Sequence, residues 1–345
     1  MGRLLRVLAP TTVLACYLLV VLGDTVRVTE SGMGCRSWPL CNGHVGLSGV
    51  YQALLEQSHR YAAALVTVLV LATFVAVWRS VERDRLARRA ASAGVALIGA
   101  QVLLGAITVF AHNAGWTVAL HLACAWLVLA AVTVTAVRAL LPAGPRGAPT
   151  LAQSAEEGRS DLAHFPAGPR GATLAQGSRP GRAPALAAVA GVFLLSVSGM
   201  LTLHEGASWA CPSWPLCLGS TAPRWLLLLQ YGHRTLTFLA TIVVAWSAVR
   251  LWRSTPARSA HKVTTGAVLA LLAATAAFGA VVATTGVPPW AQDLHLALAS
   301  AFWVGVVVLA ALPGYAPSRA RSVVAADQPP GHGAQVVTGA AFPGG

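Results

Sequence analysis

Charged residues are scarce in this chain. Only 10% of its 345 residues are Asp, Glu, Lys or Arg, whereas 56% are hydrophobic. A soluble domain of this size carries many more charges on its surface, so this composition excludes a soluble fold. Several apolar runs are long enough to cross the roughly 30 Å hydrocarbon core of a bilayer. The sequence therefore predicts an all-α, polytopic membrane protein.

Acidic residues are scarcer than basic ones, since 11 Asp and Glu accompany 24 Lys and Arg and give a formal net charge of +13. In a soluble protein such an excess would suggest a nucleic-acid partner. Here the basic residues gather in alternate loops, which is the pattern that sets orientation in a membrane. We therefore expect membrane lipid and no nucleic acid as a partner, and both termini on the cytoplasmic side.

Eight candidate transmembrane helices follow from the apolar runs, at about residues 8–25, 57–78, 91–111, 117–140, 185–203, 225–246, 263–285 and 291–312. One constant offset along the chain carries His59 to His233 and His121 to His295. The chain is thus predicted to be a duplication of a four-helix bundle.

The predicted domain organisation follows from this duplication. Residues 1–140 and 185–313 form the two halves. Residues 141–184 are rich in Pro and Gly, and we interpret them as a flexible cytoplasmic linker. Residues 314–345 lack helical periodicity and are predicted to be a disordered cytoplasmic tail.

The two predicted outer loops lack a C-x-x-C motif. Each has two cysteines six residues apart, Cys35 with Cys41 and Cys211 with Cys217. Because the outer face is oxidising, we expect each loop to be closed by a disulfide, either structural or electron-relaying. The alternatives are a metal site, which needs more ligands nearby, and a redox-active dithiol, which usually has the shorter spacing. The remaining cysteines, Cys16 and Cys124, are expected to pack between helices.

Each half has two histidines in the outer third of its helices, His59 with His121 and His233 with His295. A single histidine within a membrane often does no more than hydrogen-bond to a neighbouring helix. Two imidazoles at one depth on two helices of a bundle could instead ligate the iron of a haem. Zinc or copper would normally need a third or fourth protein ligand, and no Cys, Asp or Glu repeats at this depth. The duplicated spacing favours haem.

The halves differ three residues before the first histidine of each. Glu56 lies on the same helix face as His59, and the matching residue in the second half is Gln230. A carboxylate near the membrane interior is costly, which suggests acid–base catalysis or stabilisation of positive charge. The alternative is a carboxylate solvated among the lipid headgroups. The first half is therefore the predicted reaction site, and the second half the predicted cofactor site.

Three further polar residues have an interpretation from their positions. Arg60 and Arg234 directly follow the first histidine of each half, and they either reach the headgroups or pair with a haem propionate. His204 takes the place that Glu30 has in the first half, and we interpret it as an interface residue.

Taken together, these residues resemble the haem A synthase family. The resemblance rests on Trp-Pro-Leu-Cys in both outer loops, on Glu-x-x-His-Arg at residues 56–60, on the second histidine of each half and on the duplication, and it covers about residues 7–313. It implies that the substrate haem O binds between His59 and His121, that Glu56 is the catalytic residue, and that a resident haem b binds between His233 and His295.

The reaction that the resemblance implies is oxidation of the C8 methyl group of haem O to a formyl group, with water as the source of oxygen. The product, haem A, would serve terminal oxidase assembly. The resemblance also implies an oxidoreductase of a bacterial cell membrane that works with haem O synthase and with a quinone or another membrane electron acceptor. The sequence departs from the family at Glu30, where the family's turn has glycine.

Two other classes of function remain open from the sequence. One is a non-catalytic membrane cytochrome with two b-type haems, in which the difference between Glu56 and Gln230 would be incidental. The other is a haem carrier that binds haem without transforming it. The type of haem in pigment extracts, after co-expression with a haem O-producing enzyme, would distinguish these functions from haem A synthesis.

Overall fold

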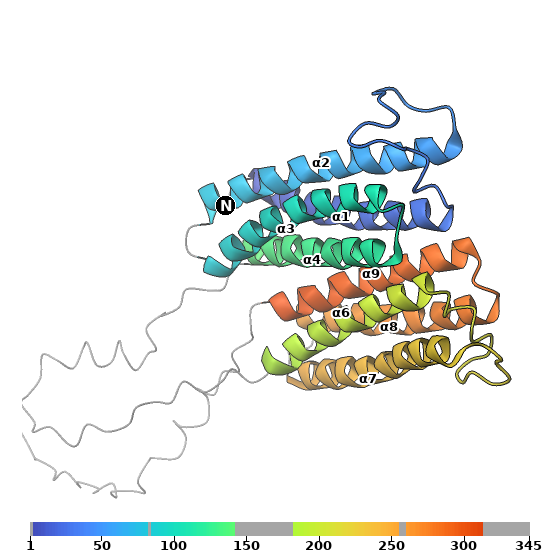
Figure 1. Ribbon diagram of the computed structural model, residues 1–345. Helices are drawn as coiled ribbons and strands as arrows, with labels where there is room; N and C mark the ends of the chain where they lie inside the picture. The colour runs from blue at the N-terminus through green and yellow to red at the C-terminus, as the bar shows by residue number, and fades with distance from the viewer. Residues whose placement is uncertain (1–2, 82–83, 142–181, 255–259, 313–345) are drawn as a thin grey trace, which may run out of the picture. The chain divides into compact units, whose positions relative to one another are not determined.

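The computed structural model describes residues 3–81, 84–141, 182–254 and 260–312. Eight α-helices make up most of these residues, and they are α1 (Arg3–Val28), α2 (Tyr51–Ser80), α3 (Arg85–Phe110), α4 (Gly115–Leu140), α6 (Arg182–His204), α7 (Arg224–Ser254), α8 (Ala260–Thr284) and α9 (Pro289–Ala311) (Figure 1). All eight are long and apolar enough to cross a membrane. The prediction of an all-α protein with eight membrane spans is confirmed.

The predicted linker, residues 141–184, and the predicted tail, residues 314–345, lie almost wholly outside the described residues. Their flexibility therefore stays a prediction, as do the domain boundaries that depend on it. The helices α1 to α9 all belong to one compact unit.

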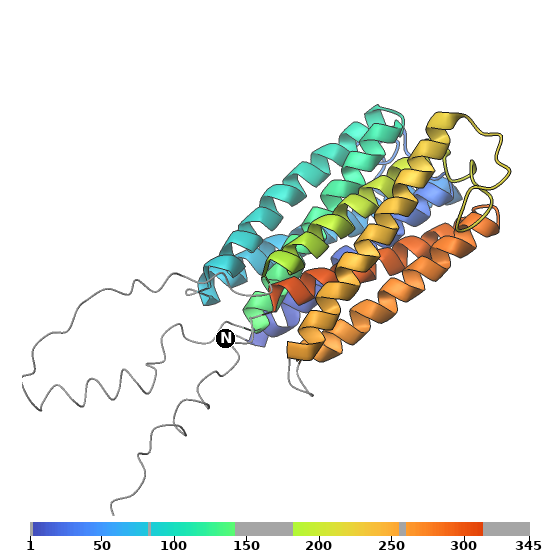
Figure 2. The same cartoon turned by 90° about the horizontal axis from the view of Figure 1, so that it is seen from below.

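The helices pack in two groups that follow the order of the chain (Figures 1 and 2). In the first group each of α1 to α4 contacts the next helix, and α4 also packs against α1. In the second group α6 to α9 repeat this arrangement, with α9 against α6. The groups meet where α4 packs against α6 and α9, and where α1 packs against α9.

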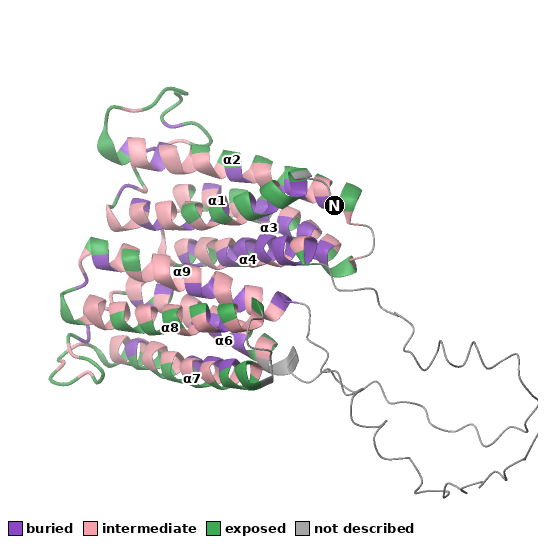
Figure 3. Ribbon diagram, turned by 180° about the vertical axis from the view of Figure 1, so that it is seen from behind, coloured by how far each residue is buried: buried purple, intermediate pink, exposed green. Residues whose placement is uncertain are grey.

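Two tryptophans join the groups at their centre. Trp126 on α4 and Trp303 on α9 are 2% and 1% exposed, and their rings stack with centroids 5.5 Å apart. The indole N–H of Trp303 also donates to the backbone oxygen of Trp126 over 2.9 Å. Figure 3 shows that α4 carries a dense run of buried residues in its second half. The interior of the protein therefore continues across the boundary between the groups.

The two cysteine loops lie at the same end of the helices (Figure 1). At the other end, basic residues occupy the last turns of three helices, with Arg79 on α2, Arg138 on α4 and Arg253 on α7. Arg138 forms an ion pair of 2.6 Å with Asp84, the N-cap residue of α3. This segregation is the one on which the predicted orientation depends, and the cytoplasmic placement of the basic end remains a prediction.

The end of α1 explains the departure at Glu30. Glu30 has a left-handed backbone with a φ of 53°, and the N–H of Ser31 donates to the backbone oxygen of Val26 over 2.8 Å. This is the geometry of a Schellman C-cap, in which the left-handed residue is usually glycine. In the second half Gly206 has this place, with a φ of 72°. The fold therefore favours glycine where the chain has glutamate.

The match between Glu30 and His204 was wrong. Glu30 and Gly206 each lie five residues before the first cysteine of their loop, so the two are counterparts in this segment. The offset between the halves changes after the loops, because Cys217 and His233 are closer together in the chain than Cys41 and His59. The ring of His204 packs against Gly115 of α4, where an added Cβ would lie 3.2 Å from the ring. Its interpretation as an interface residue stays a prediction.

Replacing Glu30 by glycine should stabilise the protein. A left-handed backbone costs a non-glycine residue about 1 kcal/mol or more, and the Glu30 side chain is exposed, so its loss removes no packing. We expect Glu30→Gly to raise the midpoint of thermal unfolding in detergent by a few degrees, the equivalent of about 1 kcal/mol. Glu30→Ala is the control. An equal shift for both variants would contradict the conformational explanation.

Candidate functional site

Each of the four predicted histidines lies against a glycine of the helix before its own. A Cβ atom added to that glycine would lie 2.9 to 3.3 Å from the histidine Cε1 atom. The pairs are Gly23 with His59, Gly105 with His121, Gly199 with His233 and Gly279 with His295. At such distances an alanine would displace the ring, so the glycines allow each imidazole to lie close to the neighbouring helix. The sequence did not predict a role for these glycines. Gly105 and Gly279 are nevertheless related by the same offset as the histidines.

The structure brings the histidines together in the predicted pairs. His59 and His121 lie within electrostatic range of each other in the first group of helices, as do His233 and His295 in the second. Within the described residues, no cluster of three or more His, Cys, Asp or Glu side chains has an arrangement suited to a metal ion. Each site thus offers two imidazole donors from two helices.

The nitrogens of the four rings have different partners. Nδ1 of His59, of His121 and of His295 is buried without a hydrogen-bond partner in the described part of the chain. In contrast, Nδ1 of His233 lies 2.9 Å from the hydroxyl of Ser198 on α6. A hydrogen bond at one ring nitrogen fixes the ring and directs the other nitrogen toward a metal. Of the four histidines, His233 is therefore the one whose ring orientation is fixed by a hydrogen bond at Nδ1.

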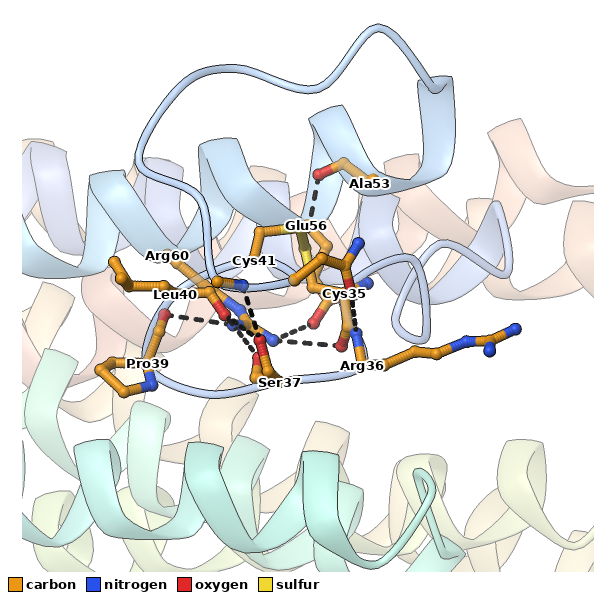
Figure 4. A network of polar contacts seen from close by, with 11 residues as sticks. Cys35, Arg36, Ser37, Pro39, Leu40, Cys41, Ala53, Glu56 and Arg60 are labelled. Atoms are coloured by element: carbon orange, nitrogen blue, oxygen red, sulfur yellow. Dashed lines mark hydrogen bonds and ion pairs between the residues drawn. A yellow bond between two sulfur atoms is a disulfide. The ribbon is translucent and has the colours of Figure 1, made fainter.

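Glu56 is buried, with 4% of its surface exposed, so it is not solvated among headgroups. Its Oε2 accepts the backbone N–H of Cys35 over 2.8 Å, and its Oε1 accepts a guanidinium N–H of Arg60 over 2.6 Å (Figure 4). The matching residue, Gln230, is also buried. Residues 56 and 230 are therefore both buried, and they differ in the negative charge that only Glu56 carries.

The arginines that follow the first histidines hold the outer loops. Arg60 donates to the backbone oxygens of Ser37 over 2.6 Å and of Pro39 over 3.1 Å (Figure 4). In the second half Arg234 donates to the backbone oxygen of Pro215 over 2.8 Å. Sequence reasoning missed this role, although the i,i+4 spacing of Glu56 and Arg60 is one at which helical ion pairs form. Pairing of either arginine with a propionate remains a prediction.

Both loops are closed by the predicted disulfides. Cys35 pairs with Cys41 and Cys211 with Cys217, with Cα atoms 4.7 and 4.9 Å apart. Cys16 and Cys124 are buried free cysteines, as expected for packing residues. Because Glu56 contacts Cys35, and because Arg60 contacts both Glu56 and the loop, the closed loop and the carboxylate form one network.

Removing Arg60 should destabilise the protein more than removing Arg234. Both variants lose hydrogen bonds to a loop, which costs about 1 kcal/mol or somewhat more. Only Arg60→Met also leaves a buried carboxylate without its partner, which costs about 3 kcal/mol or more. Thermal unfolding in detergent measures the difference.

The double variant Glu56→Gln/Arg60→Met provides the control for this prediction. It removes the buried charge, and it gives the first half the glutamine that the second half has. It should therefore recover most of the stability lost in Arg60→Met. Equal losses in Arg60→Met and Arg234→Met would show that the ion pair contributes nothing.

Comparison with known proteins agrees with this geometry. The family model described as cytochrome oxidase assembly protein, COX15-CtaA, matches residues 48–307. The curated protein named heme A synthase from Geobacillus thermodenitrificans is 28% identical over 320 residues, which cover 88% of each chain. The heme A synthase of Geobacillus kaustophilus is 29% identical with the same coverage. That of Symbiobacterium thermophilum is 29% identical and covers 87% of this chain and 92% of its own. The chain belongs to the haem A synthase family of cytochrome oxidase assembly proteins.

Proposed function

We propose that this protein is a haem A synthase of a bacterial cell membrane, which oxidises the C8 methyl group of haem O to a formyl group. The observation that carries the proposal is the buried carboxylate of Glu56, one helical turn from His59, at a position where the second half has Gln230. Family membership and the two histidine pairs support haem as the group on which it acts. The product would serve terminal oxidase assembly.

The residues at each histidine pair fit a haem. Two imidazoles from two helices would supply the ligands for the iron of a low-spin haem. We assign the resident haem b to His233 and His295, because Ser198 holds the His233 ring. The substrate haem O is assigned to His59 and His121, beside Glu56. When bound, the resident haem supplies electron transfer toward a quinone or another membrane acceptor.

The overall reaction defines what the protein residues have to do. Conversion of a methyl group and one water molecule to a formyl group releases four protons and four electrons. A carboxylate beside the reacting carbon stabilises positive charge that develops there, and it accepts a proton from the attacking water. Glu56 is suited to this role because Arg60 and the Cys35 N–H fix both of its oxygens. The loop above it limits access of bulk water to the site.

The two other functions, a di-haem cytochrome and a haem carrier, both bind haem without needing Glu56. Neither explains a carboxylate in one half at a position where the other half has an isosteric amide. We therefore retain them only as outcomes of the following experiment.

Glu56→Gln should abolish synthesis of haem A while the protein still folds and binds haem. The amide keeps one of the two oxygens, so it still accepts one of the N–H groups of Cys35 and Arg60, and the variant removes the charge together with the other hydrogen bond. Loss of such a group at a water-poor site lowers a rate by about 10²–10³-fold. Haem extracted from cells that co-express a haem O-producing enzyme should contain haem O or a partly oxidised product.

Gln230→Glu is the matched control, and it should not create a second reaction site. Near-normal haem A production by Glu56→Gln would remove the carboxylate from the mechanism. Binding of haem without any haem A, even in the unchanged protein, would instead favour the cytochrome or the carrier.

The second half can be tested separately through its haem content. His233→Ala and His295→Ala should each lose the low-spin haem b spectrum of the purified protein, because a ligand to the iron is missing. Ser198→Ala should keep the ligand but weaken haem retention by about tenfold, since it loses the support of the ring. A full low-spin haem b spectrum in the double histidine variant would overturn the assignment.

A further inference from the structure

The first group of helices contains a polar contact that the mechanism above does not use. Gln101 on α3 lies one helical turn before Gly105, so both residues are on the face toward His121. The Gln101 side-chain N–H donates to Nε2 of His121 over 3.1 Å. Its Oε1 is buried and has no partner among the described residues. Burial of a half-satisfied amide in an apolar bundle costs free energy, which points to a function.

This amide occupies the nitrogen through which His121 would bind iron. Nδ1 of His121 is buried, as is Nδ1 of His59 and of His295. Nδ1 of His233 bonds to Ser198, so Nε2 is the ligating nitrogen in the half that has a supported ring. The accepting nitrogen of a neutral imidazole has one lone pair, and it bonds either to an N–H group or to a metal. Ligation of iron by Nε2 of His121 therefore has to break the bond from Gln101.

The second half has no amide at the matching position. The offset that relates the histidines carries Gln101 to Thr275 on α8. The hydroxyl of Thr275 donates to the backbone oxygen of Leu271 within its own helix. Gly279 nevertheless lies against His295 as Gly105 lies against His121. The two halves thus share the glycine beside the ring and differ in the group that faces it. The His295 ring has a backbone hydrogen bond with Thr275, whose oxygen can only accept, whereas the Gln101 amide N–H occupies the lone pair of His121 Nε2.

We propose that Gln101 is an exchange partner for His121, which makes iron ligation in the first half labile. The amide takes over Nε2 when the bond to iron breaks, so haem O enters and haem A leaves more readily. This inference rests on the proposed function, which assigns a passing substrate to the first half and a resident cofactor to the second. Gln101 is a positioning residue in this account, because it acts through His121.

The test is the rate at which haem leaves the full-length protein. Purified protein loaded with haem b is mixed with an excess of apomyoglobin, and transfer is followed by absorbance. The phase that is missing in His121→Ala reports on the first half. In Gln101→Leu this phase should be roughly fivefold slower, since one competing hydrogen bond is lost. Thr275→Val is the matched control and should change neither phase.

Gln101→Thr gives α3 the residue that α8 has at the matching position. It should slow the same phase, and it replaces the leucine variant if that variant does not fold. A phase that is unchanged in Gln101→Leu or in Gln101→Thr overturns the proposal. A faster phase also overturns it, because the amide would then stabilise bound haem.

The two proposals fail in different ways. If no releasable haem depends on His121, the site assignment under the proposed function is wrong, and this inference is wrong with it. If a phase that depends on His121 is present but insensitive to the Gln101 variants, this inference alone is wrong.

Discussion

The close approach of an imidazole to a glycine on the next helix is the contact on which the rest of this structure depends. Helices in lipid gain little from burying apolar side chains against each other, so small residues that permit close packing decide which helices pair. The four glycine–histidine contacts join α1 to α2, α3 to α4, α6 to α7 and α8 to α9. These are also the four most extensive contacts between helices. The same pairings that build each bundle therefore place its histidines.

The duplication is broken where the two halves touch. The offset that relates the histidines pairs Trp126 with Ser300 and Leu129 with Trp303, and all four side chains are almost fully buried. Each half thus supplies a tryptophan at one of these positions and a smaller residue at the other. The two indoles stack on each other, so the contact uses one tryptophan from each half. Tryptophan at all four of these close-packed positions would not fit. Departure from the repeat at this boundary is what packing requires of two similar halves.

Much of the fold and of the site could be predicted from the sequence. The eight spans follow from apolar runs alone, and the two disulfides follow from cysteine spacing in loops without arginine clusters. The histidine pairs were visible because duplication repeats their spacing. In contrast, the match of His204 with Glu30 failed because a difference in loop length changes the offset. Counting back from the first cysteine of each loop gives Gly206 as the counterpart, and the left-handed backbone that Glu30 and Gly206 share agrees with it.

What the sequence could not provide is the partner of each polar group. Ser198 and Gln101 lie on helices adjacent to those of the histidines they contact, so their role depends on the rotation of one helix against another. Hydropathy does not define the rotation of a helix about its axis precisely enough to say which residue faces a given histidine. The two residues are also not counterparts in the repeat, so the offset that revealed the histidines could not reveal them.

The network around Glu56 combines contacts that both halves share with a carboxylate that only the first half has at this position. The tie between the arginine and the loop is present in each half, through Arg60 and through Arg234, so it belongs to the scaffold that closes the outer end. The carboxylate is an addition to that scaffold. It is compensated by Arg60, which the scaffold already contained, and the cost of burying its charge is thereby reduced. A reaction site and a cofactor site can therefore share one fold, because a single charge at a position already lined by a cation distinguishes them.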